Sequence, residues 1–133
     1  MGILRPRAPS LVIQAQPSDN PPADSPAGIL LQQLHEHPKD WRQRCGLAAN
    51  PSTPPEVMEY LAADSKPMVR VFLAANRCCS PAVLDLLSYD RDIKVRRTVA
   101  TNPACSPETL QRLAGDPDIK VARLVTDNPT HWE

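Results

Sequence analysis

The sequence predicts an all-α protein, an α-solenoid of about four short two-helix repeats with no β-sheet. Asparagine recurs at an even spacing of 26 residues, at Asn50, Asn76, Asn102 and Asn128. Aspartate, proline and apolar residues recur in the same register. A fixed period in this range is typical of stacked repeat proteins, in which each unit buries its apolar face against its neighbours. Each unit has room for two helices, both shorter than the roughly 12 residues that an isolated helix needs.

The first segment of the chain, residues 1–28, is rich in proline and poor in apolar residues. Proline interrupts helices, and so little apolar surface cannot offset the entropy lost on ordering. We therefore expect a disordered tail, and we assign residues 29–133 to the solenoid. The apolar triplet Leu11-Val12-Ile13 is either an incidental part of a linker, which we favour, or a docking motif that adds a strand to a partner's sheet.

The first repeat unit is predicted to be irregular. Residues 29–34 are mostly apolar and indicate a short helix, which ends at the segment His-Pro-Lys-Asp at 37–40. The residue before a proline disfavours the helical conformation, which supports a break at this point. Residues 41–49 then indicate the second helix of the unit, which ends at Asn50.

Each later unit is predicted to contain two helices separated by an aspartate. The first helix starts at a capping serine followed by proline, as in Ser80-Pro81 and Ser106-Pro107. Proline is harmless at the first helical position because the N–H it lacks has no partner there. The breaks after these helices lie at Asp64, Asp90 and Asp116. The second helix ends at the asparagine, which we expect to adopt the left-handed conformation that often closes a helix.

The asparagine row is the strongest candidate pattern among the polar residues. We predict that Asn50, Asn76, Asn102 and Asn128 form a structural ladder, in which each amide holds its turn and pairs with the adjacent unit. The alternative is a ligand-binding row of amides.

Basic residues follow the same period. Arg44, Arg70 and Arg96 form one row, and Lys94 and Lys120 belong to a second row that begins at Arg42. These rows could contact the phosphates of a nucleic acid or an acidic protein surface, so the candidate partner-binding residues are Arg44, Arg70, Arg96, Lys94 and Lys120. The competing interpretation, which we favour, is that they pair with the aspartates at the breaks and with their neighbours.

The cysteines and histidines offer a weaker hypothesis. Cys79 and Cys105 hold equivalent positions just before a helix cap, which favours a buried apolar role. The cysteines lack the paired spacing of a zinc site, and His35 and His37, near Cys45, lie at a helix end and a turn. We predict no catalytic residue, no metal and no cofactor, and we keep a metal or redox protein as the third functional hypothesis.

The repeat unit resembles the leucine-rich repeat variant family of bacterial helical repeat proteins. The resemblance covers about residues 29–130 and is clearest from Asn102 to Ala114 and at Val95-Arg96. It is weaker at Arg77, which replaces the proline that follows the other asparagines. The resemblance implies a right-handed superhelix in which α-helices alternate with short 3-10 helices, and it implies no catalytic residues.

Composition narrows the function further. Lys plus Arg and Asp plus Glu both total 15, so no net charge drives nucleic-acid binding. The sequence has no apolar run near the roughly 20 residues of a membrane span and no signal peptide pattern, so we expect a cytoplasmic protein. The fold favours a non-enzymatic interaction module that binds a protein partner. A nucleic-acid-binding helical repeat is the alternative, and the sequence leaves the partner and the oligomeric state open.

Overall fold

A computed structural model describes residues 22–36 and 40–132 of the chain. These residues form eight α-helices and one 3-10 helix, with no strand among them, so the predicted all-α repeat solenoid is confirmed. The helices are α2 (Pro26–Glu36), α3 (Trp41–Ala49), α4 (Pro55–Leu61), α5 (Pro67–Ala75), α6 (Pro81–Leu87), α7 (Ile93–Thr101), α8 (Pro107–Leu113), α9 (Ile119–Thr126) and the 3-10 helix η2 (Pro129–Trp132). None of them is long and apolar enough to cross a membrane.

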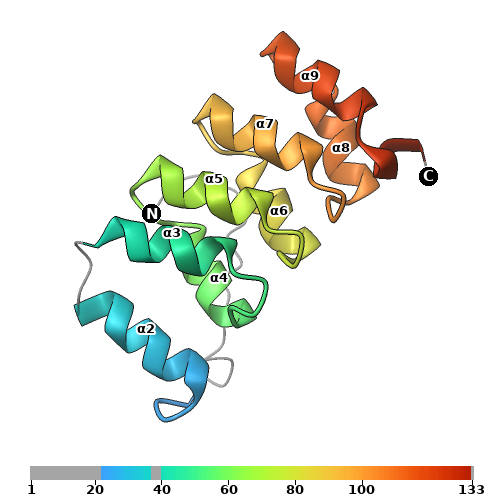
Figure 1. The fold of residues 1–133 in the computed structure, drawn as a ribbon. Helices are drawn as coiled ribbons and strands as arrows, with labels where there is room; N and C mark the ends of the chain where they lie inside the picture. The colour runs from blue at the N-terminus through green and yellow to red at the C-terminus, as the bar shows by residue number, and fades with distance from the viewer. Residues whose placement is uncertain (1–21, 37–39, 133) are drawn as a thin grey trace, which may run out of the picture.

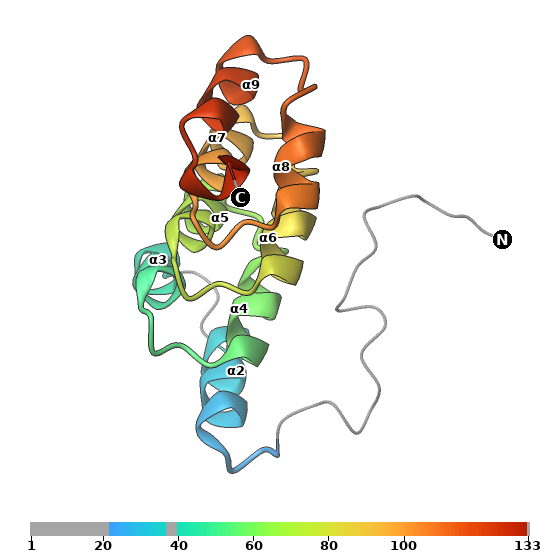
Figure 2. The same ribbon diagram turned by 90° about the vertical axis from the view of Figure 1, so that its right-hand side faces the viewer.

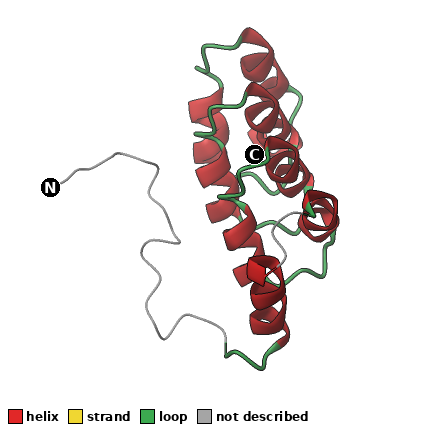
Figure 3. Cartoon of the chain, turned by 90° about the vertical axis from the view of Figure 1, so that its left-hand side faces the viewer, coloured by secondary structure: helices red, strands yellow, loops and turns green. Residues whose placement is uncertain are grey.

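The helices form two layers that run the length of the solenoid (Figure 1, Figure 2). We call α3, α5, α7 and α9 the second-helix layer, in which each helix packs against the next. We call α2, α4, α6 and α8 the first-helix layer, where α2 packs against α4. Figure 3 shows helices and loops and no strand among the described residues. The 3-10 helix η2 packs against both α8 and α9 at the far end.

The core lies between the two layers and repeats from unit to unit. Leu61, Leu87 and Leu113, at the ends of the first helices, are at most 2% exposed. The valines that begin each second helix, at 69, 95 and 121, are fully buried. Burying one such side chain contributes about 1.5–3 kcal/mol. Because these residues come from successive units, the apolar core is shared between neighbours and no unit holds a core of its own.

The predicted serine caps are confirmed at two of the first helices. The hydroxyl of Ser80 accepts a hydrogen bond from the backbone N–H of Val83, and that of Ser106 accepts one from Thr109. The equivalent residue in the earlier unit is Pro54, which makes no side-chain cap. Two of the three breaks, at Asp90 and Asp116, are followed by an aspartate that caps the next helix, since Asp92 caps α7 and Asp118 caps α9.

Two local predictions were wrong in detail. Both helices of each unit are α-helices, whereas the family resemblance implied alternation with 3-10 helices. Two turns of α-helix are enough to carry the buried valine and leucine of each layer. The asparagines at 50, 76 and 102 adopt extended backbone angles, and no described residue, glycine included, has a positive φ. The physical reason is that each asparagine side chain accepts the turn N–H two residues ahead, which an extended residue allows.

The solenoid also begins earlier than its predicted boundary at residue 29. Helix α2 starts at Pro26, after Ser25, whose hydroxyl accepts from the N–H of Gly28. A side chain at Gly28 would collide with the carbonyl oxygen of Pro22, which lies 2.0 Å from the position of an added Cβ. Residues 26–28 therefore belong to the first unit. Residues 22–25 of the predicted tail form a turn before α2, and residues 1–21, including the apolar triplet at 11–13, lie outside the described residues.

Candidate interaction surface

The asparagine ladder joins each unit to the one before it. The side-chain nitrogen of Asn102 donates to the carbonyl oxygens of Ala74 (2.7 Å) and Asn76 (3.0 Å). Its side-chain oxygen accepts from the N–H of Ala104 at 2.8 Å. Asn76 and Asn128 make the same three bonds one unit earlier and one unit later.

These three asparagines are buried and fully used by the fold. Asn76, Asn102 and Asn128 are 5%, 3% and 1% exposed, so their amides cannot reach a ligand at the surface. Each satisfies carbonyl groups that the last turn of a helix leaves without an intrahelical partner. Asn50 differs, because it is exposed and, among the described residues, its side chain makes one hydrogen bond, accepted from the N–H of Ser52 at 2.8 Å.

An arginine ladder joins each unit to the one after it. Arg70 donates from Nε and Nη2 to both carboxylate oxygens of Asp90, at 2.6 and 3.1 Å. Its Nη1 donates to the backbone carbonyl of Asp64, the break residue of its own unit, at 2.5 Å. The carboxylate of Asp90 also accepts from the N–H of Asp92 at 2.9 Å. One guanidinium therefore ties together the breaks of two successive units.

The same ladder includes Arg44 with Asp64 and Arg96 with Asp116, with closest contacts of 2.6 and 2.8 Å. The arginine side chains at 44, 70 and 96 are only 10–14% exposed. The hydrogen bond that Arg44 donates to the Asp64 carboxylate raises the pKa of Arg44 above its ordinary value. These three predicted contact residues therefore point into the solenoid, whereas Lys94 and Lys120 are exposed.

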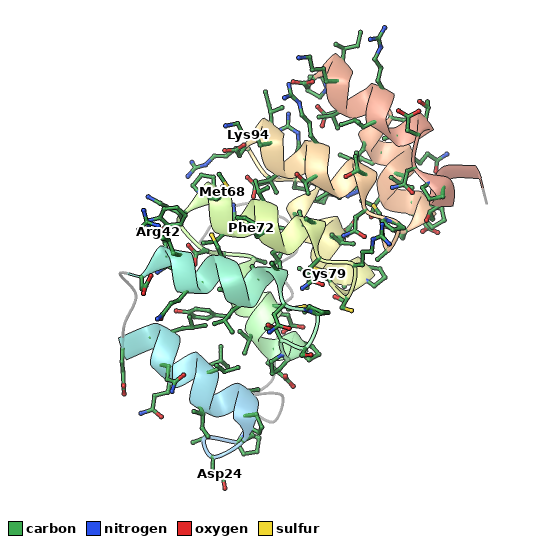
Figure 4. The ribbon with its side chains drawn as sticks, in the orientation of Figure 1. Asp24, Arg42, Met68, Phe72, Cys79 and Lys94 are labelled. Atoms are coloured by element: carbon green, nitrogen blue, oxygen red, sulfur yellow. The ribbon has the colours of Figure 1, made fainter. Side chains whose placement is uncertain are left out.

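The second-helix layer presents one row of exposed side chains near the start of its helices. The row takes the second residue of each helix, and its members are Arg42, Met68, Lys94 and Lys120. Met68 is 43% exposed, and Phe72, one turn further along α5, is 40% exposed. Figure 4 shows Arg42, Met68, Phe72 and Lys94 together over α3, α5 and α7. We call these four residues and Lys120 the exposed patch.

Aromatic and basic groups continue the exposed patch at its α3 end. The guanidinium of Arg42 lies 5.0 Å from the centre of the Trp41 ring, and the ammonium of Lys66 lies 5.1 Å from the same ring. Both distances fall in the range of a cation–π interaction. Within the described residues, none of Arg42, Lys66, Lys94 and Lys120 takes part in a salt bridge, so their charges face solvent.

The two layers carry opposite charge although the whole chain is neutral. Two basic residues lie in α3, one in α5, three in α7 and two in α9, and these four helices contain no acidic residue. The first-helix layer has one acidic residue in α2, two in α4, one in α6 and one in α8. Its lysines and arginines are limited to Arg112, which pairs with Asp85 at 2.6 Å. The composition alone hides this separation.

The cysteines and histidines do not assemble into a site among the described residues. Cys79 and Cys105 are buried, and burial raises their pKa values to about 12 and about 11. Such thiols are poor nucleophiles and poor metal ligands near neutral pH. The described residues contain no group of three or more possible metal ligands. His35 is exposed, and His37 lies outside the described residues.

Met68 and Phe72 were not singled out by sequence reasoning. The residue row contained a usable signal, because Met68 holds the position occupied by Arg42, Lys94 and Lys120 in the other units. A basic row does not by itself fix exposure, since Arg44, Arg70 and Arg96 are equally periodic and lie in buried pairs, but a methionine among basic residues marks an apolar interruption of the row.

Comparison with known proteins gives a family for one repeat unit. The leucine rich repeat variant family matches residues 93–118, which contain α7, α8 and the break at Asp116. This is the family that the repeat unit resembles in sequence. Neither the curated proteins nor the solved structures gave a match to the chain.

Proposed function

We propose, on the premise that residues 93–118 are a leucine rich repeat variant unit, that this helical repeat protein is a non-enzymatic scaffold that binds a protein partner. The unit that contains Asn76 and Arg70 makes the same asparagine and arginine ladder bonds. Stacked repeats of this kind offer a continuous surface across several units, which suits binding to an extended partner.

The exposed patch is the observation that carries this proposal. Met68 and Phe72 are two of the larger apolar side chains of the chain, and α5 places them side by side on its outer surface. Basic side chains lie on both sides, at Arg42 on α3 and Lys94 on α7. An apolar centre with a charged margin is the usual anatomy of a protein–protein interface, where methionine, aromatic residues and arginine are enriched.

Nucleic-acid binding is the second candidate, and one observation favours it. The second-helix layer is basic throughout, and Phe72 could stack on a base. Three observations weigh against it. The arginines at 44, 70 and 96 are held by aspartates, Met68 interrupts the row of free cations, and the chain has no net charge. A protein partner therefore accounts for more of the surface.

Site-specific photo-crosslinking tests the proposal. The photoreactive residue p-benzoylphenylalanine replaces Phe72 in one variant and Tyr60 in a matched control, because Tyr60 is 41% exposed and lies on α4 in the other layer. Both variants are irradiated in the cells that make the protein. We expect discrete protein adducts from position 72 and none from position 60, identified by mass spectrometry.

Two results of this experiment would contradict the proposal. One is the absence of protein adducts at position 72, and the other is the same set of adducts from both positions. Adducts that nuclease treatment removes would instead support the nucleic-acid candidate.

A further inference from the structure

The surface chemistry also indicates what kind of partner segment binds. We infer that the exposed patch binds an acidic segment of a partner protein that carries one apolar anchor between acidic residues. This inference rests on the proposed function, and it adds the chemical class of the partner. Three features of the described residues carry it: the sign of the charge, the position of the apolar pair, and the spacing of the cations around that pair.

The sign of the charge selects an acidic partner. The second-helix layer has no acidic residue within its helices, and the acidic groups at its edge cap those helices or pair with the arginine ladder. Asp92 and Asp118, for example, accept backbone N–H groups of α7 and α9. A surface with cations that have no salt bridge attracts an acidic segment and repels a basic one.

The apolar pair supplies the anchor. Met68 and Phe72 lie one helical turn apart on α5, so their side chains form one continuous apolar surface. Both side chains are at least 40% exposed, so a large part of their apolar surface contacts solvent in the free chain. Methionine adapts its shape to different apolar groups, and an aromatic ring adds contact area at little entropic cost. A leucine or aromatic side chain of the partner fits this surface.

The spacing of the cations sets the length of the segment. Arg42 and Lys94 lie on α3 and α7, the two helices that flank α5. Packed helices lie about 8–10 Å apart, so the two cations are separated by roughly 16–20 Å. An extended chain covers this distance in about five or six residues. The segment therefore places its acidic residues about three positions before and three positions after the anchor, with Lys120 available to further acidic residues.

A protein segment fits this surface better than a nucleic acid does. Phosphate groups follow one another at short and regular intervals, so a phosphate-binding row needs a cation in every unit. Here the central unit offers Met68 where the others offer Arg42, Lys94 and Lys120. A second copy of this chain could also present an acidic face, because its first-helix layer is acidic, and the experiment below separates that case.

A fluorescence anisotropy titration with designed probes tests the inference. The main probe is a labelled peptide of about 12 residues, enough to extend past both cations, with a central Leu-Trp pair and glutamates on both sides. One control peptide replaces the glutamates with glutamine, and a second replaces the Leu-Trp pair with serine. A single-stranded oligonucleotide is the fourth probe. All four are titrated with the full chain at low and at physiological salt.

We expect the main probe to bind at least about tenfold more tightly than either control peptide, because it alone satisfies both the charge and the anchor. Its affinity should fall as salt rises. The variants Phe72→Ser and K94E/K120E should each weaken it by about tenfold. Matched controls are Tyr60→Ser, on the other layer, and Arg77→Glu, in the turn beyond the opposite end of α5, and neither should change the affinity.

The remaining outcomes overturn the inference in distinguishable ways. Equal binding of the glutamine peptide, or no binding of the main probe, excludes the acidic class and leaves the scaffold proposal to the crosslinking result. If the oligonucleotide binds more tightly than the main probe, both the acidic-segment inference and the protein-scaffold proposal are overturned. Self-association of the free chain in analytical ultracentrifugation, abolished by K94E/K120E, shows that the patch binds a second copy instead of a partner segment.

Discussion

The first unit of the solenoid differs from the units that follow it in its asparagine and matches them in its arginine. In the later units asparagine is buried and reaches back to the preceding unit, as Asn102 does to Ala74 and Asn76. In the first unit Asn50 is exposed and, within the described part of the chain, its side chain binds its own turn and no other group. Arginine does not show this difference, because Arg44 pairs with Asp64 just as Arg70 pairs with Asp90.

The direction of each ladder explains this contrast. An asparagine needs a repeat unit before it, whereas an arginine needs one after it. The first unit, formed by α2 and α3, has no earlier asparagine turn before it among the described residues, so Asn50 has no carbonyl groups of that kind to reach. It precedes a complete unit, so its arginine is fully used. The contribution of a repeated residue to the free energy of unfolding therefore depends on whether the neighbouring unit that it contacts is present. The following predictions test that dependence.

The largest effect is expected from the arginine ladder. Arg70→Met should lower the free energy of unfolding by about 3 kcal/mol, because it leaves the buried carboxylate of Asp90 without its cation. Arg44→Met should cost a similar amount, since its partner Asp64 is equally buried. Urea denaturation followed by circular dichroism measures both. A loss in Arg44→Met of less than a third of that in Arg70→Met would contradict the direction we assign to this ladder.

The asparagine ladder should show the opposite behaviour between units. Asn102→Ala removes the donor to two carbonyl groups and the acceptor of one N–H, so we expect a loss of about 2 kcal/mol. Asn50→Ala removes a single exposed bond and should cost less than about 0.5 kcal/mol. The same denaturation experiment compares them. If the two losses were equal, burial of the later asparagines would have no energetic consequence, and the contrast between units would fail.

The position occupied by Cys79 should make the free energy of unfolding depend on pH, whereas the equivalent Thr53 should not. Burial raises the pKa of Cys79 from 9.0 to about 12, so its neutral form stabilises the fold fully below pH 9. As the pH rises toward 12 the unfolded chain ionises first, and that stability is lost. Between pH 8 and pH 10 the loss attributable to Cys79 should be about 1.4 kcal/mol.

The control for this effect comes from the first unit, where the equivalent residue is Thr53. Threonine does not ionise in this range, and its hydroxyl donates to the carbonyl of Leu47 at 2.6 Å. Cys79→Thr should therefore remove the extra pH dependence, whatever its effect at pH 8. An unchanged slope of stability against pH in this variant would show that the Cys79 thiol does not stay neutral in the fold.

The smallest effect is expected at the helix caps. Ser80→Ala should lower the free energy of unfolding by about 1 kcal/mol, because it removes the cap of α6. Pro54→Ser places a capping residue at the start of α4, but the loss of the proline also increases the conformational entropy of the unfolded chain. These two effects are each about 0.5–1 kcal/mol and oppose one another, so the net change should be near zero. A gain above 1 kcal/mol would show that the proline contributes no stability at this position.

Much of the fold could be read from the sequence because its determinants are local. Ser80 and Ser106 before proline predict where α6 and α8 begin, and both caps are present. The break aspartates and the asparagine turns also lie where the period places them. A short-range prediction failed at Asn76, which is extended and not left-handed. Its side-chain oxygen accepts the N–H of Cys78, so the side chain satisfies the turn without a left-handed residue.

The candidate site was less accessible to sequence reasoning. Lys94 and Lys120 were proposed as contacts and are exposed, and Arg44, Arg70 and Arg96 were proposed with them but are buried in pairs. All five are basic residues at the same period, so nothing local separates the two groups. The apolar centre at Met68 and Phe72 was not found, since an apolar residue in a short helix is more often part of the core.

The sequence by itself determined the number of units, the helix starts and the residues that repeat, since these depend on spacing and on contacts within a few positions. Only the tertiary structure decided which repeated residues face inward. Arg70 meets Asp90 across a gap of 20 residues, and this requires the relative placement of two units. The same stacking leaves Met68 and Phe72 at the surface between basic neighbours. Exposure is a property of how units pack together, and a linear period carries no information about it beyond the row to which a residue belongs.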